Sequence, residues 1–274
     1  NPYRRGTETE RCLACGSSAK TKMTRLGGRS LINARLAESP YGQRTTTTLM
    51  SAILANRWFG TVPPEVRDAG GVLGPIRLEA ATGEDHSPLV SIPKPDGMKE
   101  RARQFLRWLQ KVNPQGRWGQ FLTNDQRDLR WEKVIMAGSS HGSTTAARFS
   151  MYQSVDRVVM FCGPRDNTEI WQGGRSATPP HRFFGFTHVL DKGWQEDHYC
   201  RSWQLLKLNQ CGDVVNVENS SPPYENTRRL ITDCDLKGNV RQAHSGVVPK
   251  QSAFRNDEGA FRHEAVWKYL FLHP

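Results

Sequence analysis

The sequence has no run of 18 apolar residues, so no segment predicts a membrane-spanning helix. It also lacks an N-terminal signal-peptide pattern and any nucleic-acid-binding motif. Cys12 and Cys15 form one half of a zinc ribbon, and no second half is present. We therefore expect no metal and no cofactor. Because the chain begins at Asn1 rather than Met, a secreted or periplasmic location is favoured if an export signal has been removed.

What the sequence does contain is enough apolar material for a folded core. The chain has 274 residues, and its 36% hydrophobic content includes eight Trp and eleven Phe, which need a packed interior. Six cysteines allow three disulfides, but they fit unpaired thiols equally well, and the sequence does not give a pairing.

Positive charge is concentrated at the N-terminal end. Residues 1–60 hold ten Lys and Arg against three acidic residues, a net of +7 out of +11 for the whole chain. Such an arm could bind polyanions, but a solvated segment without nucleic-acid binding is the expected case. We predict an irregular basic segment over 1–75 and one folded domain over 76–274.

The folded part alternates between helix-like and strand-like patterns. Helices are predicted where apolar residues recur every three to four positions, and buried strands where short β-branched or aromatic runs occur. The predicted helices are 98–112, 144–152, 198–208 and 264–272, and the predicted strands are 76–79, 133–137, 156–161, 183–187 and 213–217. This order indicates an α/β protein with a mostly parallel sheet flanked by helices.

Ligands of parallel sheets bind at the carboxyl ends of the strands, so the residues that follow each strand are the candidates for a site. Four chemically useful side chains occupy such positions: Ser140, Asp166, Asp191 and, in the long segment after 213–217, His244.

The most informative stretch is Gly-Ser-Ser-His-Gly, residues 138–142, between a predicted strand and a predicted helix. It fits Gly-x-Ser-x-Gly, in which a sharp turn raises the serine above the sheet. The turn explains the glycines at 138 and 142, because the backbone two residues before the serine and two residues after it would come too close for side chains. Such a turn places the backbone N–H of His141 at a helix N-terminus, where it can stabilise an oxyanion.

The residues "VIMAGSSHGS" and the following "RVVMFCGP", with a serine, an acid and a histidine in that order, resemble the α/β-hydrolase fold over 76–274. "GRWGQFL", "RFFGFTH" and "SPPYENTR" are similar to an uncharacterised group of predicted α/β-hydrolase-like proteins. The resemblance implies that Ser140 is the nucleophile, Asp191 the acid and His244 the base, with Asp166 as the alternative acid.

The expected function is that of a serine hydrolase, a carboxylesterase acting on a small-molecule ester through an acyl-enzyme. Residues 1–75 show neither the early strands of that fold nor the loop that completes its oxyanion hole. The alternative is therefore a hydrolase-like scaffold without activity that binds other molecules. Trp171, Trp194 and Trp203 could line an acyl pocket, although at least two of them are expected to pack in the core.

Overall fold

The computed structural model describes residues 61–68, 70–166, 170–249 and 253–273, together with the backbone of four short strands between residues 25 and 50. The half zinc ribbon at Cys12 and Cys15 and most of the basic arm lie outside these residues. No helix among the described residues is long and apolar enough to cross a membrane.

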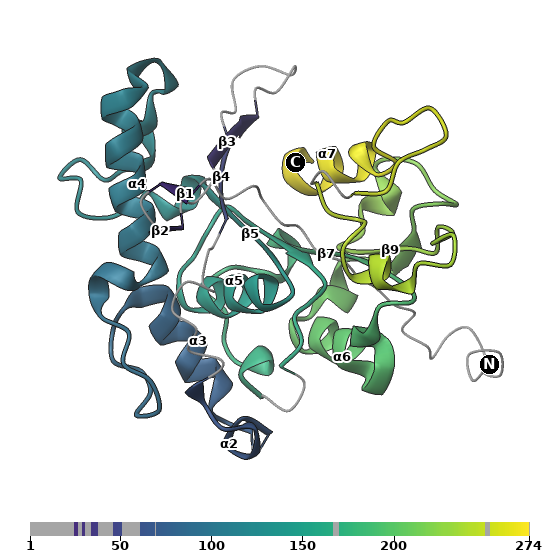
Figure 1. The fold of residues 1–274 in the computed structure, drawn as a ribbon, viewed down its shortest axis with the longest axis horizontal. Coiled ribbons are helices and arrows are strands. Elements are labelled where there is room, and N and C mark those ends of the chain that lie inside the picture. The colour runs from purple at the N-terminus through teal and green to yellow at the C-terminus, as the bar shows by residue number, and fades with distance from the viewer. Residues whose placement is uncertain are drawn as a thin grey trace.

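A seven-stranded sheet forms the centre of the molecule, in the order β3-β4-β5-β6-β7-β9-β8 (Figure 1). Its strands are β3 (Ala34–Ala37), β4 (Thr46–Met50), β5 (Val134–Ser139), β6 (Arg157–Phe161), β7 (Phe183–His188), β8 (Val214–Asn216) and β9 (Arg229–Thr232). β3 runs antiparallel to β4, and every other neighbouring pair is parallel. A separate two-stranded ribbon joins β1 (Arg25–Leu26) and β2 (Arg29–Ser30).

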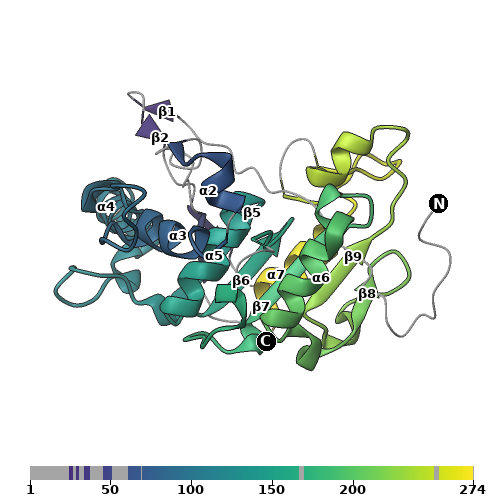
Figure 2. The ribbon, with the colours of Figure 1, turned by 90° about the horizontal axis from the view of Figure 1, so that it is seen from below.

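Helices cover both faces of this sheet, as Figure 2 shows from below. They are α2 (Pro64–Asp68), α3 (Leu73–Thr82), α4 (Met98–Val112), α5 (His141–Tyr152), α6 (His198–Leu205) and α7 (Glu264–Leu272). Successive strand residues point to opposite faces. Val134 and Met136 therefore pack in one core with α4, α5 and α6, whereas Ile135 and Ala137 pack in another with α7.

The structure thus confirms an α/β class with a parallel sheet between helices. The helices predicted over 98–112 and 264–272 have those bounds. The strands predicted from residue 133 to residue 217 also form, each within two residues of its predicted ends.

The prediction of a strand over 76–79 is wrong, because these residues lie inside α3. This helix has no amphipathic pattern, since both its apolar and its charged residues are buried. Arg77 and Glu79 are each only 2% exposed. Glu79 accepts backbone N–H groups from His86, Ser87 and Ile92, which explains how a carboxylate can be buried there.

The sheet extends across the domain boundary predicted between residues 75 and 76. β3 and β4 lie in the predicted irregular segment, and β4 pairs in parallel with β5. The segment predicted to be mostly irregular therefore contributes two strands to the sheet. Their sequences, Ala-Arg-Leu-Ala and Thr-Thr-Thr-Leu-Met, are too short and polar to give an apolar period.

Candidate active site

The turn between β5 and α5 holds Ser140 in an unusual backbone conformation. Its φ of 54° and ψ of −118° lie where residues with a side chain are seldom found. The Ser140 N–H donates a hydrogen bond of 2.9 Å to the Phe161 carbonyl at the end of β6. Its own carbonyl accepts hydrogen bonds from the Ser143 and Thr144 hydroxyls. The turn is therefore fixed from both sides.

The two glycines of the turn have different roles. A Cβ atom on Gly138 would lie 2.2 Å from the carbonyl group of Gly142, so the close approach of these two backbones requires glycine at 138. A Cβ atom on Gly142 would meet no described atom within 4 Å. The expectation that Gly142 is needed to avoid a clash of its own side chain is wrong.

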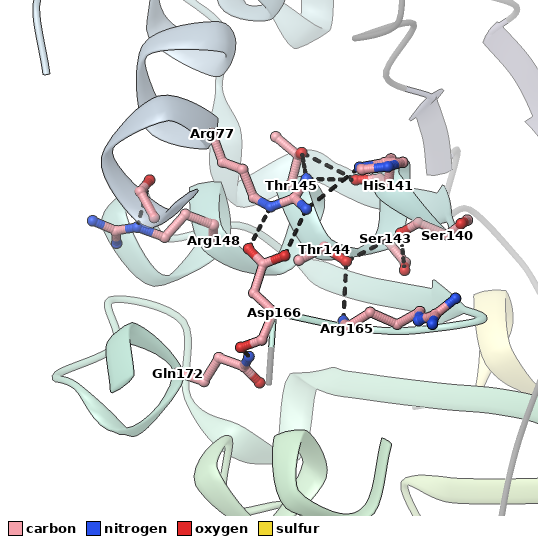
Figure 3. A network of polar contacts seen from close by, with 11 residues as sticks. Arg77, Ser140, His141, Ser143, Thr144, Thr145, Arg148, Arg165, Asp166 and Gln172 are labelled. Carbon is pink, nitrogen blue, oxygen red and sulfur yellow. Dashed lines mark hydrogen bonds and ion pairs between the residues drawn. The ribbon is translucent and has the colours of Figure 1, made fainter. Parts of the chain in front are cut away.

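His141 begins α5, and its ring points away from the turn toward Arg77 (Figure 3). The His141 Nδ1 lies 3.4 Å from a guanidinium nitrogen of Arg77. Burial, reinforced by the positive charge of Arg77, lowers the pKa of His141 to about 4, so the ring is neutral near pH 7. Its backbone N–H lies in the first turn of the helix, where no intrahelical acceptor exists for it.

A histidine and a carboxylate predicted from the sequence meet across 53 residues of chain. His244 Nδ1 lies 2.7 Å from Asp191 Oδ2. Asp191 follows β7, and His244 ends a short 3-10 helix, Val240–His244, in the segment after β9. Because a carboxylate only accepts, Nδ1 carries the proton of this bond, and Nε2 of the neutral ring is left as the acceptor.

Asp191 is held by two further donors that the sequence did not reveal. Its side chain accepts the Tyr199 hydroxyl at 3.0 Å and the Gly193 N–H at 3.2 Å, and it is only 4% exposed. Burial alone would raise the pKa of Asp191. The hydrogen bond and charge of His244, with the other two donors, instead lower this pKa below its usual value. Asp191 is thus an oriented carboxylate that stays ionised near neutral pH.

The backbone after β6 connects Ser140 with His244. Phe161 accepts the Ser140 N–H, and the thiol of the next residue, Cys162, donates to the His244 carbonyl at 3.3 Å. Cys162 is fully buried and has a φ of 52°. The strained serine and the histidine–aspartate pair are therefore fixed to the same two residues.

Asp166, the alternative acid, is engaged elsewhere. Its two carboxylate oxygens accept from the Arg77 guanidinium at 2.5 and 2.6 Å, and both side chains are buried (Figure 3). Arg77 also donates to the Thr145 hydroxyl and to the His141 carbonyl. This network ties α3 to α5 below the turn, and it involves none of the contacts of His244 given above.

A second histidine–carboxylate pair lies beyond β8 and β9. His263 Nε2 lies 2.9 Å from Glu218 Oε1, and the other Glu218 oxygen accepts from Arg262 at 2.5 Å. The Thr232 hydroxyl also donates to Glu218. Burial would raise the pKa of Glu218, but these hydrogen bonds lower it to about 2. The His263 ring is only 2% exposed.

Each of these pairs lies close to a thiol, which together give two sets of potential metal ligands. In the sets Cys162, Asp191, His244 and Glu218, Cys234, His263, the ligand atoms lie within 4.8 Å of one another. Asp191 and Glu218 already accept three or more hydrogen bonds each, so an ion would have to displace these donors. The simpler interpretation is that each set is a hydrogen-bonded histidine–carboxylate pair with a thiol nearby. Cys211 and Cys234 are unpaired thiols, and with the thiol of Cys162 they exclude a pattern of three disulfides.

Of the three tryptophans near the site, Trp194 and Trp203 are core residues. They are 6% and 0% exposed and pack against each other edge to face. Trp171 is half-buried against the same core, and the Arg148 guanidinium lies over its ring. The expectation that at least two of the three are packing residues is confirmed.

The fold and the site define the chain as an α/β protein with a strained serine and an oriented histidine–aspartate pair at one edge of its sheet. No family model, no curated protein and no solved structure matches this chain. The chemistry of these residues is therefore the basis for any statement about function.

Proposed function

We propose that the protein is a serine hydrolase that cleaves a carboxylic ester through an acyl-enzyme on Ser140. The observation that carries this proposal is the 2.7 Å contact between His244 and Asp191, held beside a strained serine. A serine hydroxyl is a weak nucleophile until a base removes its proton, and the base needs a carboxylate to fix its tautomer. The described residues include each of these three groups.

In the proposed reaction, Ser140 Oγ attacks the ester carbonyl while His244 Nε2 takes the hydroxyl proton. The tetrahedral oxyanion is stabilised by the His141 N–H, and the leaving alcohol receives its proton from His244. Water then attacks the acyl-enzyme with the same base. His244 takes the proton of this water and returns it to Ser140 Oγ as the acid product leaves. Asp191 orients the His244 ring and stabilises the positive charge that the ring carries while it holds a proton in transit.

The assignment of Asp191 rather than Asp166 as the acid rests on their partners. Both oxygens of Asp166 accept from the guanidinium of the buried Arg77, which binds this carboxylate bidentately. Asp191 instead contacts His244 directly. This difference also makes a purely structural role for the Asp191 pair less economical than a catalytic one.

The test is hydrolysis of p-nitrophenyl butyrate by the purified protein and by two variants. Ser140→Ala should reduce the rate to the uncatalysed level, because it removes the attacking oxygen. Ser139→Ala deletes the neighbouring hydroxyl, which the proposal does not use, and should retain most of the activity. A folded parent protein without activity toward a panel of esters would instead support the inactive-scaffold alternative. Equal activity in Ser140→Ala would exclude Ser140 as the nucleophile.

A further inference from the structure

Two charge pairs formed by described residues lie near the Ser140 turn. Arg77 and Asp166 neutralise each other, and Asp191 is bound to His244. Among the described residues, the Arg165 guanidinium has neither a hydrogen bond nor an ion pair, although its backbone N–H donates to the Thr144 hydroxyl at 3.2 Å. Arg165 is only half-buried, so its charge is accessible, and no described residue forms an ion pair with it.

The position of Arg165 places this charge beside the site. It lies four residues beyond β6, and its backbone is bound to the first turn of α5, where Thr144 in turn donates to the Ser140 carbonyl. Figure 3 shows its side chain running away from Asp166, on the side of the network where Ser140 is drawn.

The electrostatic effect of Arg165 reaches both halves of the site. Its positive charge contributes to the lowered pKa of His141, next to the nucleophile, and it opposes the rise in the pKa of Tyr199, whose hydroxyl binds Asp191. Since His141 is itself neutral near pH 7, it does not repel an anion there. The charge of Arg165 therefore acts on residues next to Ser140 and next to Asp191, and a neutral ester would make no use of it.

We propose that Arg165 binds an anionic group of the substrate, so that the site prefers esters that carry a carboxylate. This inference rests on the proposed function. A guanidinium presents a planar fork of N–H donors that matches a carboxylate, and such charge-assisted pairs are stronger than neutral hydrogen bonds. Because no described residue pairs with this guanidinium, an anion bound to it would displace none of them.

The experiment compares matched neutral and anionic substrates. On the acyl side these are p-nitrophenyl butyrate and mono-p-nitrophenyl glutarate, and on the alcohol side phenyl acetate and 4-acetoxybenzoate. Arg165→Gln removes the charge, and Arg175→Gln removes the same charge from an exposed position as a control. Binding of glutarate and of butyrate is measured by calorimetry, which gives the affinity of the anion site independently of ester hydrolysis.

The proposal predicts a higher kcat/KM for the anionic member of at least one pair. Arg165→Gln should raise KM for that ester by roughly 10- to 100-fold and leave the neutral ester unchanged. The preference should weaken in high salt, and glutarate binding should be lost in Arg165→Gln but kept in Arg175→Gln.

Three results would overturn the inference. One is equal use of neutral and anionic esters, with Ser140-dependent activity intact. Another is a fall in kcat for every ester in Arg165→Gln, which would mean that Arg165 stabilises the oxyanion and does not bind an anionic group of the substrate. The third is absence of glutarate binding to the parent protein, which would remove the anion site. If the protein lacks esterase activity but binds glutarate through Arg165, the anion site stands and the hydrolase proposal fails.

Discussion

Two histidine–carboxylate pairs of nearly equal length lie in this molecule, and they differ in what surrounds the histidine. The His244 side chain is 38% exposed, and its loop is bound to the strand end beside Ser140. His263 is 2% exposed, packs against Phe186 and Phe254, and shares Glu218 with Arg262. The same two chemical groups thus occur once at the exposed sheet edge and once in the interior.

The comparison shows that a short contact alone does not identify a catalytic pair. What distinguishes Asp191 is that all its donors orient it toward a histidine whose other nitrogen can reach solvent or substrate. Glu218 is saturated by four donor atoms from three side chains. Exposure of the histidine, rather than the length of the contact, separates the pair that we propose to be catalytic from the buried pair.

The largest expected effect distinguishes the two pairs directly. Asp191→Asn should reduce kcat for p-nitrophenyl butyrate by roughly 10⁴-fold, because an amide favours the wrong tautomer of His244. Glu218→Gln makes the same chemical change in the other pair and should alter kcat by only a few-fold. Steady-state kinetics of both folded variants check this. Equal losses in the two variants would mean that the pairs do not differ as described.

The buried Arg77–Asp166 pair should matter for stability rather than for chemistry. Arg77→Met leaves Asp166 as an uncompensated buried charge and should lower the free energy of unfolding by about 3–5 kcal/mol. Arg77→Met combined with Asp166→Leu should restore much of that loss. Urea denaturation measures both variants. A double variant as unstable as the single one would contradict the assignment of the cost to an unpaired carboxylate.

The Glu218 pair should make a contribution to stability that depends on pH. The folded-state pKa of about 2 lies below the usual 4.5, so the contribution is complete above pH 4.5 and is lost as the pH falls toward 2. At about 1.4 kcal/mol for each pKa unit, it amounts to about 3 kcal/mol. Glu218→Gln should lack it.

The measurement is the difference in unfolding free energy between the parent and Glu218→Gln as a function of pH. This difference should shrink as the pH is lowered from 6 to 2. A difference that stays constant over this range would show that the ionisation of Glu218 is not what stabilises the pair.

The smallest expected effect concerns Tyr199, which orients Asp191. Tyr199→Phe removes one of three donors, so the pKa of Asp191 should rise and the carboxylate should hold the His244 ring less firmly. We expect a loss in kcat of about 10-fold. Tyr224→Phe, a buried tyrosine in the other core, is the control and should shift neither quantity.

Much of the fold could be predicted because its central elements have strong patterns. β5, β6 and β7 each contain four consecutive apolar or glycine residues, and α4 has a clear apolar face. β9 was missed because Arg-Leu-Ile-Thr is short and begins with a charge, which is stabilised by the Gly212 carbonyl. His244 consequently follows β9, rather than the strand predicted over 213–217.

The site could be predicted only in part. The spacing of Gly-Ser-Ser-His-Gly predicted the strand-to-helix turn that holds Ser140, and the order of strand ends left Asp166 and Asp191 as candidate acids. Nothing in the sequence pairs Arg77 with Asp166, 89 residues away, because the segment around Arg77 resembles a strand. No sequence pattern indicated that Tyr199 binds Asp191, because this contact depends on tertiary packing.

The most direct test of the account is labelling of the protein with a fluorophosphonate, followed by peptide mapping of the adduct by mass spectrometry. The account predicts one adduct, on Ser140, formed rapidly by the parent and by Glu218→Gln and very slowly by Asp191→Asn. The absence of an adduct on a folded parent protein, or an adduct on a different serine, would contradict it.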